Sequence, residues 1–194
     1  MEVLDAIHTR RAVRAYTGTP VPRDLVEGLL QAAVLAPSAM NLQPWAFAVV
    51  QDAETLHRIS DAAKRAALAA AEAEPGAGHG HHGLREALES AAFSVFYDAG
   101  TLIVICATGA GPFATGDCHL AAQNLLLAAH AEGLATCPIG LALPALRQPE
   151  LKRSLGIPAG YTPVFAAILG YPRESPAPTP RRAPEIVAWI PARP

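Results

Sequence analysis

The chain contains little charge, few aromatic residues and no long apolar run. Asp, Glu, Lys and Arg make up 16% of its 194 residues, and Phe, Trp and Tyr only 6%. The most apolar stretch, Leu102–Ala107, is far shorter than the roughly 20 residues that a membrane span needs. An acid at position 2 and the lack of an uninterrupted apolar segment near the N-terminus argue against a signal peptide. We therefore expect no membrane association.

Apolar residues nevertheless make up 51% of the chain. This content excludes a chain that is mainly disordered, and a chain of this length can form one domain with a substantial core. Because charge is scarce as well, a monomer would leave much apolar surface in water. We expect part of that surface to be buried against a second copy of the chain.

A strong net charge and a paired-cysteine pattern are also missing. The formal net charge of −2 gives no electrostatic reason to expect nucleic-acid binding. The three cysteines, Cys106, Cys118 and Cys137, are too widely spaced for a CxxC motif, and their number is odd. Reduced cysteines in a cytoplasmic protein are the simplest interpretation.

Hydrophobic periodicity predicts one α+β domain covering residues 1–194. Because pairs of helices separate some of the strands, a mixed or antiparallel sheet of four to five strands is favoured over a doubly wound parallel sheet. The helix at 117–132 is apolar on nearly all sides, which is typical of a buried or interfacial helix. From about residue 171 to 194 the chain is proline-rich, and we expect an extended arm. Helices are expected at 2–10, 22–36, 52–74, 84–96, 117–132 and 144–155, and strands at 46–50, 101–107, 135–139 and 162–169.

Two patterns that would indicate other chemistry are better explained as loops. His79, His81 and His82 lie among glycines without a nearby cysteine or acid, so no metal site is predicted. The stretch 109–114 fits G-x-G-x-x-A, but Pro112 removes a backbone N–H where a phosphate would need one. No pattern of residues marks a nucleophile, and no side chain is assigned a catalytic role.

Two other segments point to binding of a phosphorylated heterocycle. Arg10, Arg11 and Arg14 would supply several guanidinium donors for a phosphate, although a solvated basic turn after a helix explains them as well. The loop Pro37–Trp45 holds a serine, Asn41 and Gln43 between prolines. Amides both donate and accept hydrogen bonds, which suits the edge of a heterocycle, whereas the plainer alternative is a polar turn that buries Trp45.

Four motifs together resemble the nitroreductase family of FMN-dependent oxidoreductases. Arg10–Arg14 is similar to the opening RRSxR signature of that family, and Ala36–Trp45 is similar to its most specific stretch. Cys137–Gly140 follows the apolar helix as it does in the family, and the end of the chain adds Gly170–Pro172 and the pair Arg181-Arg182. The resemblance covers nearly the whole chain.

The resemblance implies one phosphate site built from both ends of the chain. Arg10 and Arg14, together with Arg11, would hold the FMN phosphate and ribityl chain. Arg182, with Arg181, would reach the same phosphate from the C-terminal arm. Ala12 stands where the family usually has serine, so one hydroxyl contact to the cofactor is expected to be missing.

The resemblance also implies contacts to the flavin ring from two chains. The family is an intertwined homodimer with two flavins at the interface. Asn41 would lie near the isoalloxazine edge, and Gln43 would also contact the cofactor. The partner subunit is expected to line the flavin with Pro37, Ser38, Ala39 and Met40. Pro138, Ile139 and Gly140 are expected to pass over the ring, with backbone N–H groups near its reactive edge.

The activity that the resemblance implies is an FMN-dependent NAD(P)H oxidoreductase. NADH or NADPH would deliver hydride to the flavin, and a nitroaromatic, a quinone or a similar acceptor would then take the electrons. Three alternatives remain open at this stage. They are fragmentation of reduced flavin on the same fold, reductive dehalogenation on the same fold, and a flavin-binding protein without enzymatic activity.

Overall fold

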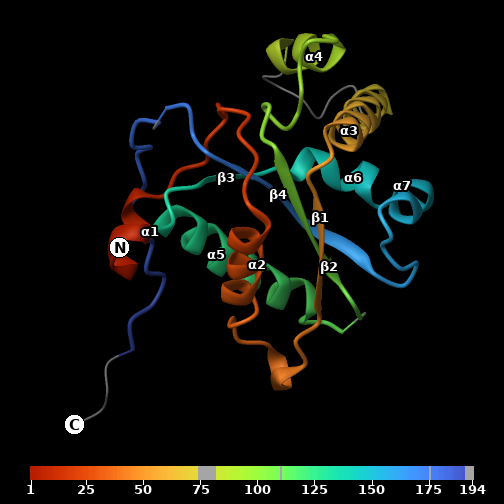
Figure 1. Ribbon diagram of the computed structural model, residues 1–194. Helices are drawn as coiled ribbons and strands as arrows, with labels where there is room; N and C mark the ends of the chain where they lie inside the picture. The colour runs from red at the N-terminus through yellow and green to blue at the C-terminus, as the bar shows by residue number, and fades with distance from the viewer. Residues whose placement is uncertain (74–81, 110, 175, 191–194) are drawn as a thin grey trace.

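A four-stranded antiparallel sheet forms the centre of the protein (Figure 1). The computed structural model describes residues 1–73, 82–109, 111–174 and 176–190. Its strands are β1 (Trp45–Val50), β2 (Thr101–Ala107), β3 (Ala135–Pro138) and β4 (Thr162–Gly170), in the order β1-β2-β4-β3. All three strand pairs are antiparallel. The α+β class with an antiparallel sheet is thereby confirmed.

Helices cover both faces of this sheet. Along β2, Leu102 and Val104 point into a core shared with α3 and α6, whereas Ile103 and Ile105 point into a core shared with α2 and α5. Every residue of β2 is buried, because both of its faces are covered. The helices are α1 (Val3–Thr9), α2 (Arg23–Ala33), α3 (Ala53–Ala73), α4 (His82–Glu89), α5 (Ala114–Ala131), α6 (Leu143–Leu146) and α7 (Pro149–Ser154), with short 3₁₀ turns η1 (Ala39–Asn41) and η2 (Gly140–Ala142).

The helix expected at 84–96 is wrong in its second half, because α4 ends at Glu89. The serine hydroxyls compete there with helical hydrogen bonding: Ser90 Oγ accepts the N–H of Ala92 at 3.3 Å, and Ser94 Oγ accepts that of Phe96 at 3.1 Å. Tyr97 and Asp98 then adopt positive φ angles of 51° and 62°. The result is an irregular segment, residues 90–98, in place of the last helical turns.

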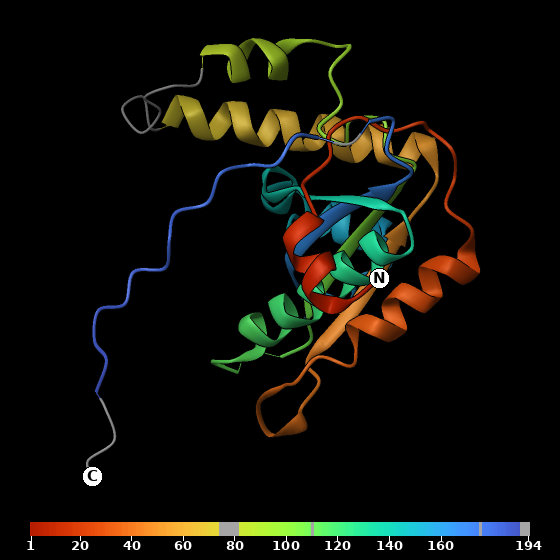
Figure 2. The ribbon, with the colours of Figure 1, turned by 90° about the vertical axis from the view of Figure 1, so that its left-hand side faces the viewer.

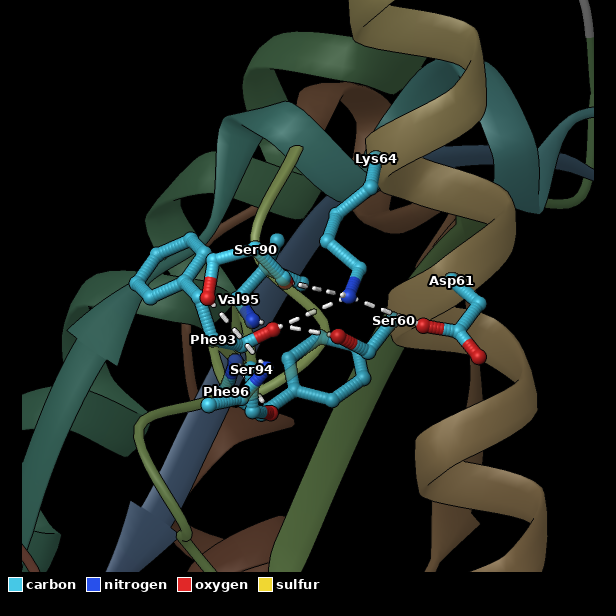
Figure 3. A network of polar contacts seen from close by, with 9 residues as sticks. Ser60, Asp61, Lys64, Ser90, Phe93, Ser94, Val95 and Phe96 are labelled. Atoms are coloured by element: carbon cyan, nitrogen blue, oxygen red, sulfur yellow. Dashed lines mark hydrogen bonds and ion pairs between the residues drawn. The ribbon is translucent and has the colours of Figure 1, made fainter. Parts of the chain in front are cut away.

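Two buried side chains of α3 hold this segment in place (Figure 3). Lys64 is 8% exposed, and its ammonium group donates to the carbonyls of Ser90 and Phe93 at 3.3 and 3.1 Å and pairs with Asp61 at 3.0 Å. Ser60 Oγ accepts the backbone N–H of Val95 at 3.1 Å. The irregular backbone therefore has buried partners that a sequence pattern does not reveal.

Replacing Ser60 by alanine is expected to lower the free energy of unfolding by about 1–3 kcal/mol, because the buried N–H of Val95 would lose its acceptor. Urea denaturation followed by circular dichroism measures this loss. Ser154→Ala is the matched control, since the Ser154 hydroxyl donates only to the Leu151 carbonyl of its own helix. An equal effect of both substitutions would contradict the anchoring role of Ser60.

The single helix expected at 144–155 is also wrong, since α6 and α7 are separate helices. Pro149 opens α7 and cannot continue a preceding helix, because it has no N–H to donate. The residue before it, Gln148, is extended, with φ −64° and ψ 133°. This is the backbone conformation that a following proline favours.

After β4 the chain leaves the sheet as an extended segment (Figure 2). The described residues 176–190 contain no helix or strand, and four large apolar side chains near the end, Ile186, Val187, Trp189 and Ile190, are exposed. We call residues 171–190 the arm. These four side chains cover no surface within the described part of one chain.

The predicted lack of a membrane span and of a metal site can be compared with the structure for the described residues only. None of the helices in the described ranges has the length and apolarity of a membrane span. Among the same residues, no group of three or more His, Cys, Asp or Glu side chains gathers as metal ligands would. Residues 75–81 of the predicted loop, which include His79 and His81, lie outside the described residues.

Candidate functional site

The Arg10–Arg14 segment lies beside β3. Helix α1 ends before it, because Arg10 is extended with φ −58° and ψ 134°. Ala12 forms an isolated parallel bridge with Thr136, and the N–H of Val13 donates to the Thr136 carbonyl at 3.1 Å. Because this bridge is parallel, Arg10 lies toward the beginning of β3 and Arg14 toward its end at Pro138, after which the chain continues to Gly140.

The same segment also pairs with the beginning of the arm. Tyr16 bridges Pro172, and the N–H of Arg173 donates to the carbonyl of Ala15 at 2.9 Å. The ring of Tyr16 is buried against Gly170, where an added Cβ would lie only 2.9 Å from Tyr16 Cδ1. A glycine is therefore required for this close approach. Three of the four motifs thus meet at one side of the sheet.

Arg10 and Arg11 line a cavity of about 260 Å³ together with His130 and Thr136. Arg11 donates to the carbonyls of His8 and Arg10 at 2.7 and 2.8 Å. Two further guanidinium nitrogens, Arg10 Nη1 and Arg11 Nε, are buried without a hydrogen-bond partner among the described residues. Buried donors of this kind need an acceptor, and phosphate oxygens would suit a pair of guanidinium groups. These residues therefore fit the FMN phosphate.

The electrostatics of this cavity also favour an anion. Burial lowers the pKa of Arg10, and the neighbouring Arg11 and Arg181 lower it further. Burial, Arg10 and Arg11 likewise lower the pKa of His130. Since like charges cause part of both shifts, a bound dianion would relieve the repulsion among these groups.

Arg181 and Arg182 differ in the evidence that they lie near Arg10 and Arg11. Arg181 lies close enough to Arg10 to affect its pKa, although the two arginines are far apart in the sequence. Arg182 is exposed and has no side-chain hydrogen bond or ion pair to any residue that the structure describes. The two ends of the chain thus come near each other at Arg10 and Arg181, whereas a common phosphate, bound by Arg181 and Arg182, stays a prediction.

Arg14 belongs to a second cavity, of about 210 Å³. Its guanidinium carbon lies 6.0 Å from the centre of the Tyr97 ring, within the range of a cation–π contact. Phe93, Ser94 and Arg173 line the same cavity. Sequence reasoning missed Phe93 and Ser94 because it placed both residues in a helix. The serines at 90 and 94, which disfavour a helix interior, were the available signal.

Pro138 and Gly140 lie exposed at the end of β3, whereas Ile139 between them is buried. The N–H of Ile139 donates to the Ala166 carbonyl of β4 at 2.8 Å. This bond fixes the backbone between Pro138 and Gly140 at the end of β3, the strand that pairs with the Arg10–Arg14 segment. Their placement is compatible with the predicted passage over a flavin ring.

The amide loop, residues 37–43, is tightly folded between α2 and β1. Ser38 Oγ accepts the N–H of Gln43 at 2.9 Å, and Gln43 Nε2 donates to Asn41 Oδ1 at 3.1 Å. Met40, Asn41 and Gln43 all have positive φ angles, of 52°, 55° and 48°. Backbone strain of this kind persists only where the surroundings support it. One such support comes from α5, since the buried Asp117 accepts the N–H of Ala39 at 3.2 Å.

Within one chain the amide loop and the arginines lie at opposite ends of α5. Asp117, in the first turn, binds the loop through Ala39, whereas His130, in the last turn, contacts Thr9 beside Arg10 at 2.8 Å. At 1.5 Å per residue, these two positions are roughly 20 Å apart along the helix. A single chain therefore presents two separate groups of predicted cofactor residues.

A third cavity, of about 420 Å³, contains none of the predicted site residues. It lies along the edge strand β1 and is closed by residues 154–158, with Cys106 and Tyr161 in its wall. Burial raises the pKa of the Cys106 thiol to about 11, so this cysteine is not a reactive thiolate. The 260 Å³ cavity is smaller, but it combines cations with two buried donors, Arg10 Nη1 and Arg11 Nε, that have no partner among the described residues.

Comparison with known proteins supports the same assignment. The model of the nitroreductase family matches residues 7–171. A protein of Methanothermobacter thermautotrophicus, provisionally named NADH dehydrogenase/NAD(P)H nitroreductase, is 32% identical over 180 residues, which cover 91% of this chain and 80% of the relative.

Solved structures with bound FMN share the fold. A nitroreductase from Bacteroides fragilis with bound FMN is 29% identical, with a TM-score of 0.79 and coverage of 98% of both chains. Iodotyrosine deiodinase bound to FMN and 3-iodo-L-tyrosine is 22% identical, with a TM-score of 0.76 and coverage of 95% of this chain and 97% of the other. At that identity the second likeness shows a common fold only.

Proposed function

The chain belongs to the nitroreductase family, and from this premise we propose that it passes electrons from NADH or NADPH, through FMN, to a nitroaromatic or quinone acceptor. That it is an FMN-dependent oxidoreductase agrees with its relatives and with the FMN-bound neighbour. The observation that carries the proposal in this chain is the pair of unpartnered buried guanidinium nitrogens of Arg10 and Arg11.

The residues of the chain bind and orient the cofactor rather than perform acid–base chemistry. Arg10 and Arg11, with Arg181, would neutralise the phosphate, and Arg14 would lie toward the ribityl chain and ring, next to Tyr97. The backbone at Pro138 and Gly140, fixed through Ile139, would cover the ring. When bound, FMN supplies the group that accepts hydride from the nicotinamide and gives the electrons to the acceptor.

We further propose an intertwined homodimer with one flavin bound between the arginines of one chain and the amide loop of the other. The separation of the two groups along α5 supports this arrangement. One small ligand can contact both kinds of group more easily when the arginines come from one chain and the amide loop comes from the other. Apolar side chains exposed on α1, the amide loop, α5 and the arm would be buried by it: Val3, Leu4, Ile7, Met40, Leu42, Leu120, Ile186, Val187, Trp189 and Ile190.

The absorption spectrum of the purified protein tests the proposal directly. We expect a yellow protein whose flavin bands are bleached by NADH or NADPH without oxygen and return when a nitroaromatic or quinone is added. A protein that neither carries FMN nor gains flavin absorbance when mixed with it would contradict the assignment. Bound FMN that neither nicotinamide reduces would indicate flavin binding without enzymatic activity.

A further inference from the structure

His130 lines the 260 Å³ cavity of Arg10 and Arg11, but it lies outside all four family motifs. It occupies the last turn of α5 and lines the cavity together with Arg10 and Arg11. Its Nε2 lies 2.8 Å from the hydroxyl oxygen of Thr9. The hydroxyl of Thr9 donates its single proton to the carbonyl of Asp5 at 2.6 Å. Nε2 of His130 must therefore carry a proton and donate it to Thr9.

This arrangement fixes the tautomer of the neutral ring. With the proton on Nε2, Nδ1 is an acceptor and cannot donate to an anion. Only the doubly protonated imidazolium would offer an N–H from Nδ1. A contact from Nδ1 to a phosphate oxygen therefore requires the uptake of a proton.

The charges around His130 decide when that proton is taken up. Arg10 and Arg11, which follow α1, disfavour a positive charge on His130. Glu174, which follows β4, also lines the cavity. Met1 also lines it, and the C-terminal end of α5 favours a cation at His130. Without an anion, burial lowers the pKa of His130, and the two arginines lower it further. A phosphate dianion in the cavity would reverse the balance.

We propose that His130 is a phosphate-binding residue that takes up a proton when FMN binds, and that it helps the protein to select FMN over riboflavin. This inference rests on the proposed function, since it assumes that the cavity holds the FMN phosphate. Its signature is a contribution to affinity that depends on both the phosphate and the pH. A residue with only a structural role would affect FMN and riboflavin alike.

The test is to measure the dissociation constants of FMN and riboflavin for flavin-free protein at pH 6.5 and pH 8.5. His130→Gln keeps an N–H for Thr9 but carries no charge. At pH 6.5 we expect it to weaken FMN binding about threefold to tenfold and to leave riboflavin binding unchanged. At pH 8.5 the difference should nearly vanish, because the group whose pKa is raised in the complex loses its proton. The phosphate of FMN also ionises in this pH range, but its effect on affinity is the same for wild type and variant and cancels in their ratio.

His119→Gln is the matched control, because His119 lies on the same helix, is exposed and contacts the carbonyl of its own turn through Nδ1 at 2.7 Å. Histidine NMR gives a second readout, in which the pKa of His130 should rise on addition of FMN and stay unchanged on addition of riboflavin. An unchanged pKa with FMN, or equal weakening of both ligands in His130→Gln, would overturn the inference. Failure of the wild-type protein to bind FMN would instead overturn the proposed function.

Discussion

Replacing Arg10 by alanine is expected to raise the dissociation constant of FMN about tenfold to a hundredfold and to leave that of riboflavin nearly unchanged. Hydrogen bonds from a charged donor contribute roughly 1.5–3 kcal/mol, which corresponds to that range. Arg10 has a buried nitrogen without a partner in the described part of the chain, so the lost interaction would be one that the ligand supplies. Fluorescence titration of the flavin-free protein measures both constants.

Two other arginines make this expectation specific. Arg23→Ala is the control, since Arg23 is exposed and pairs with Glu27 on α2, and it should change neither constant. Arg14→Ala should weaken both ligands, because Arg14 lines the cavity with Tyr97 and not the cavity proposed for the phosphate. If Arg10→Ala and Arg14→Ala weakened FMN and riboflavin by the same factors, the division into a phosphate cavity and a ring cavity would be wrong.

The sheet could be predicted from the sequence because each strand has a simple local signal. β2 was located residue for residue, since a short apolar run rich in β-branched residues is typical of a strand buried on both faces. The helix predicted at 84–96 fails in its second half for the opposite reason, because the backbone there depends on contacts between residues that are distant in the sequence. At 90–98 the buried Lys64 and Ser60 stabilise irregular backbone, and these contacts join residues about 30 positions apart. Periodicity does not report such pairings.

The site divides in the same way. The arginines and the amide loop were found because their residue types form compact motifs. Phe93, Tyr97 and His130 were missed, since each joins the site only when a distant segment folds against the arginine segment. The sequence also left open how the motifs meet. The structure brings three of them together and leaves the amide loop at the far end of α5.

That separation leads to the second large effect, which concerns mixed dimers. Arg10→Ala alters only the arginine part of the site. The pair Asn41→Gly and Gln43→Gly alters only the amide loop, and glycine suits their positive φ angles without strain. Each variant alone is expected to bind FMN at least about tenfold more weakly, because charged or amide hydrogen bonds are lost. The two variants should nevertheless complement each other when they share one dimer.

In such a heterodimer, one site combines both altered parts and the other combines two intact parts. We expect tight binding of one FMN per heterodimer of about 40 kDa, twice the mass of the 20.2 kDa chain. Co-expression with two affinity tags isolates the mixed species, and flavin absorbance gives the stoichiometry. If both parts of a site came from the same chain, every site in the mixture would carry a defect and no tight binding would return. Recovery of tight binding therefore depends on the exchange between chains that the length of α5 suggests, and light scattering of each variant alone controls for loss of the dimer.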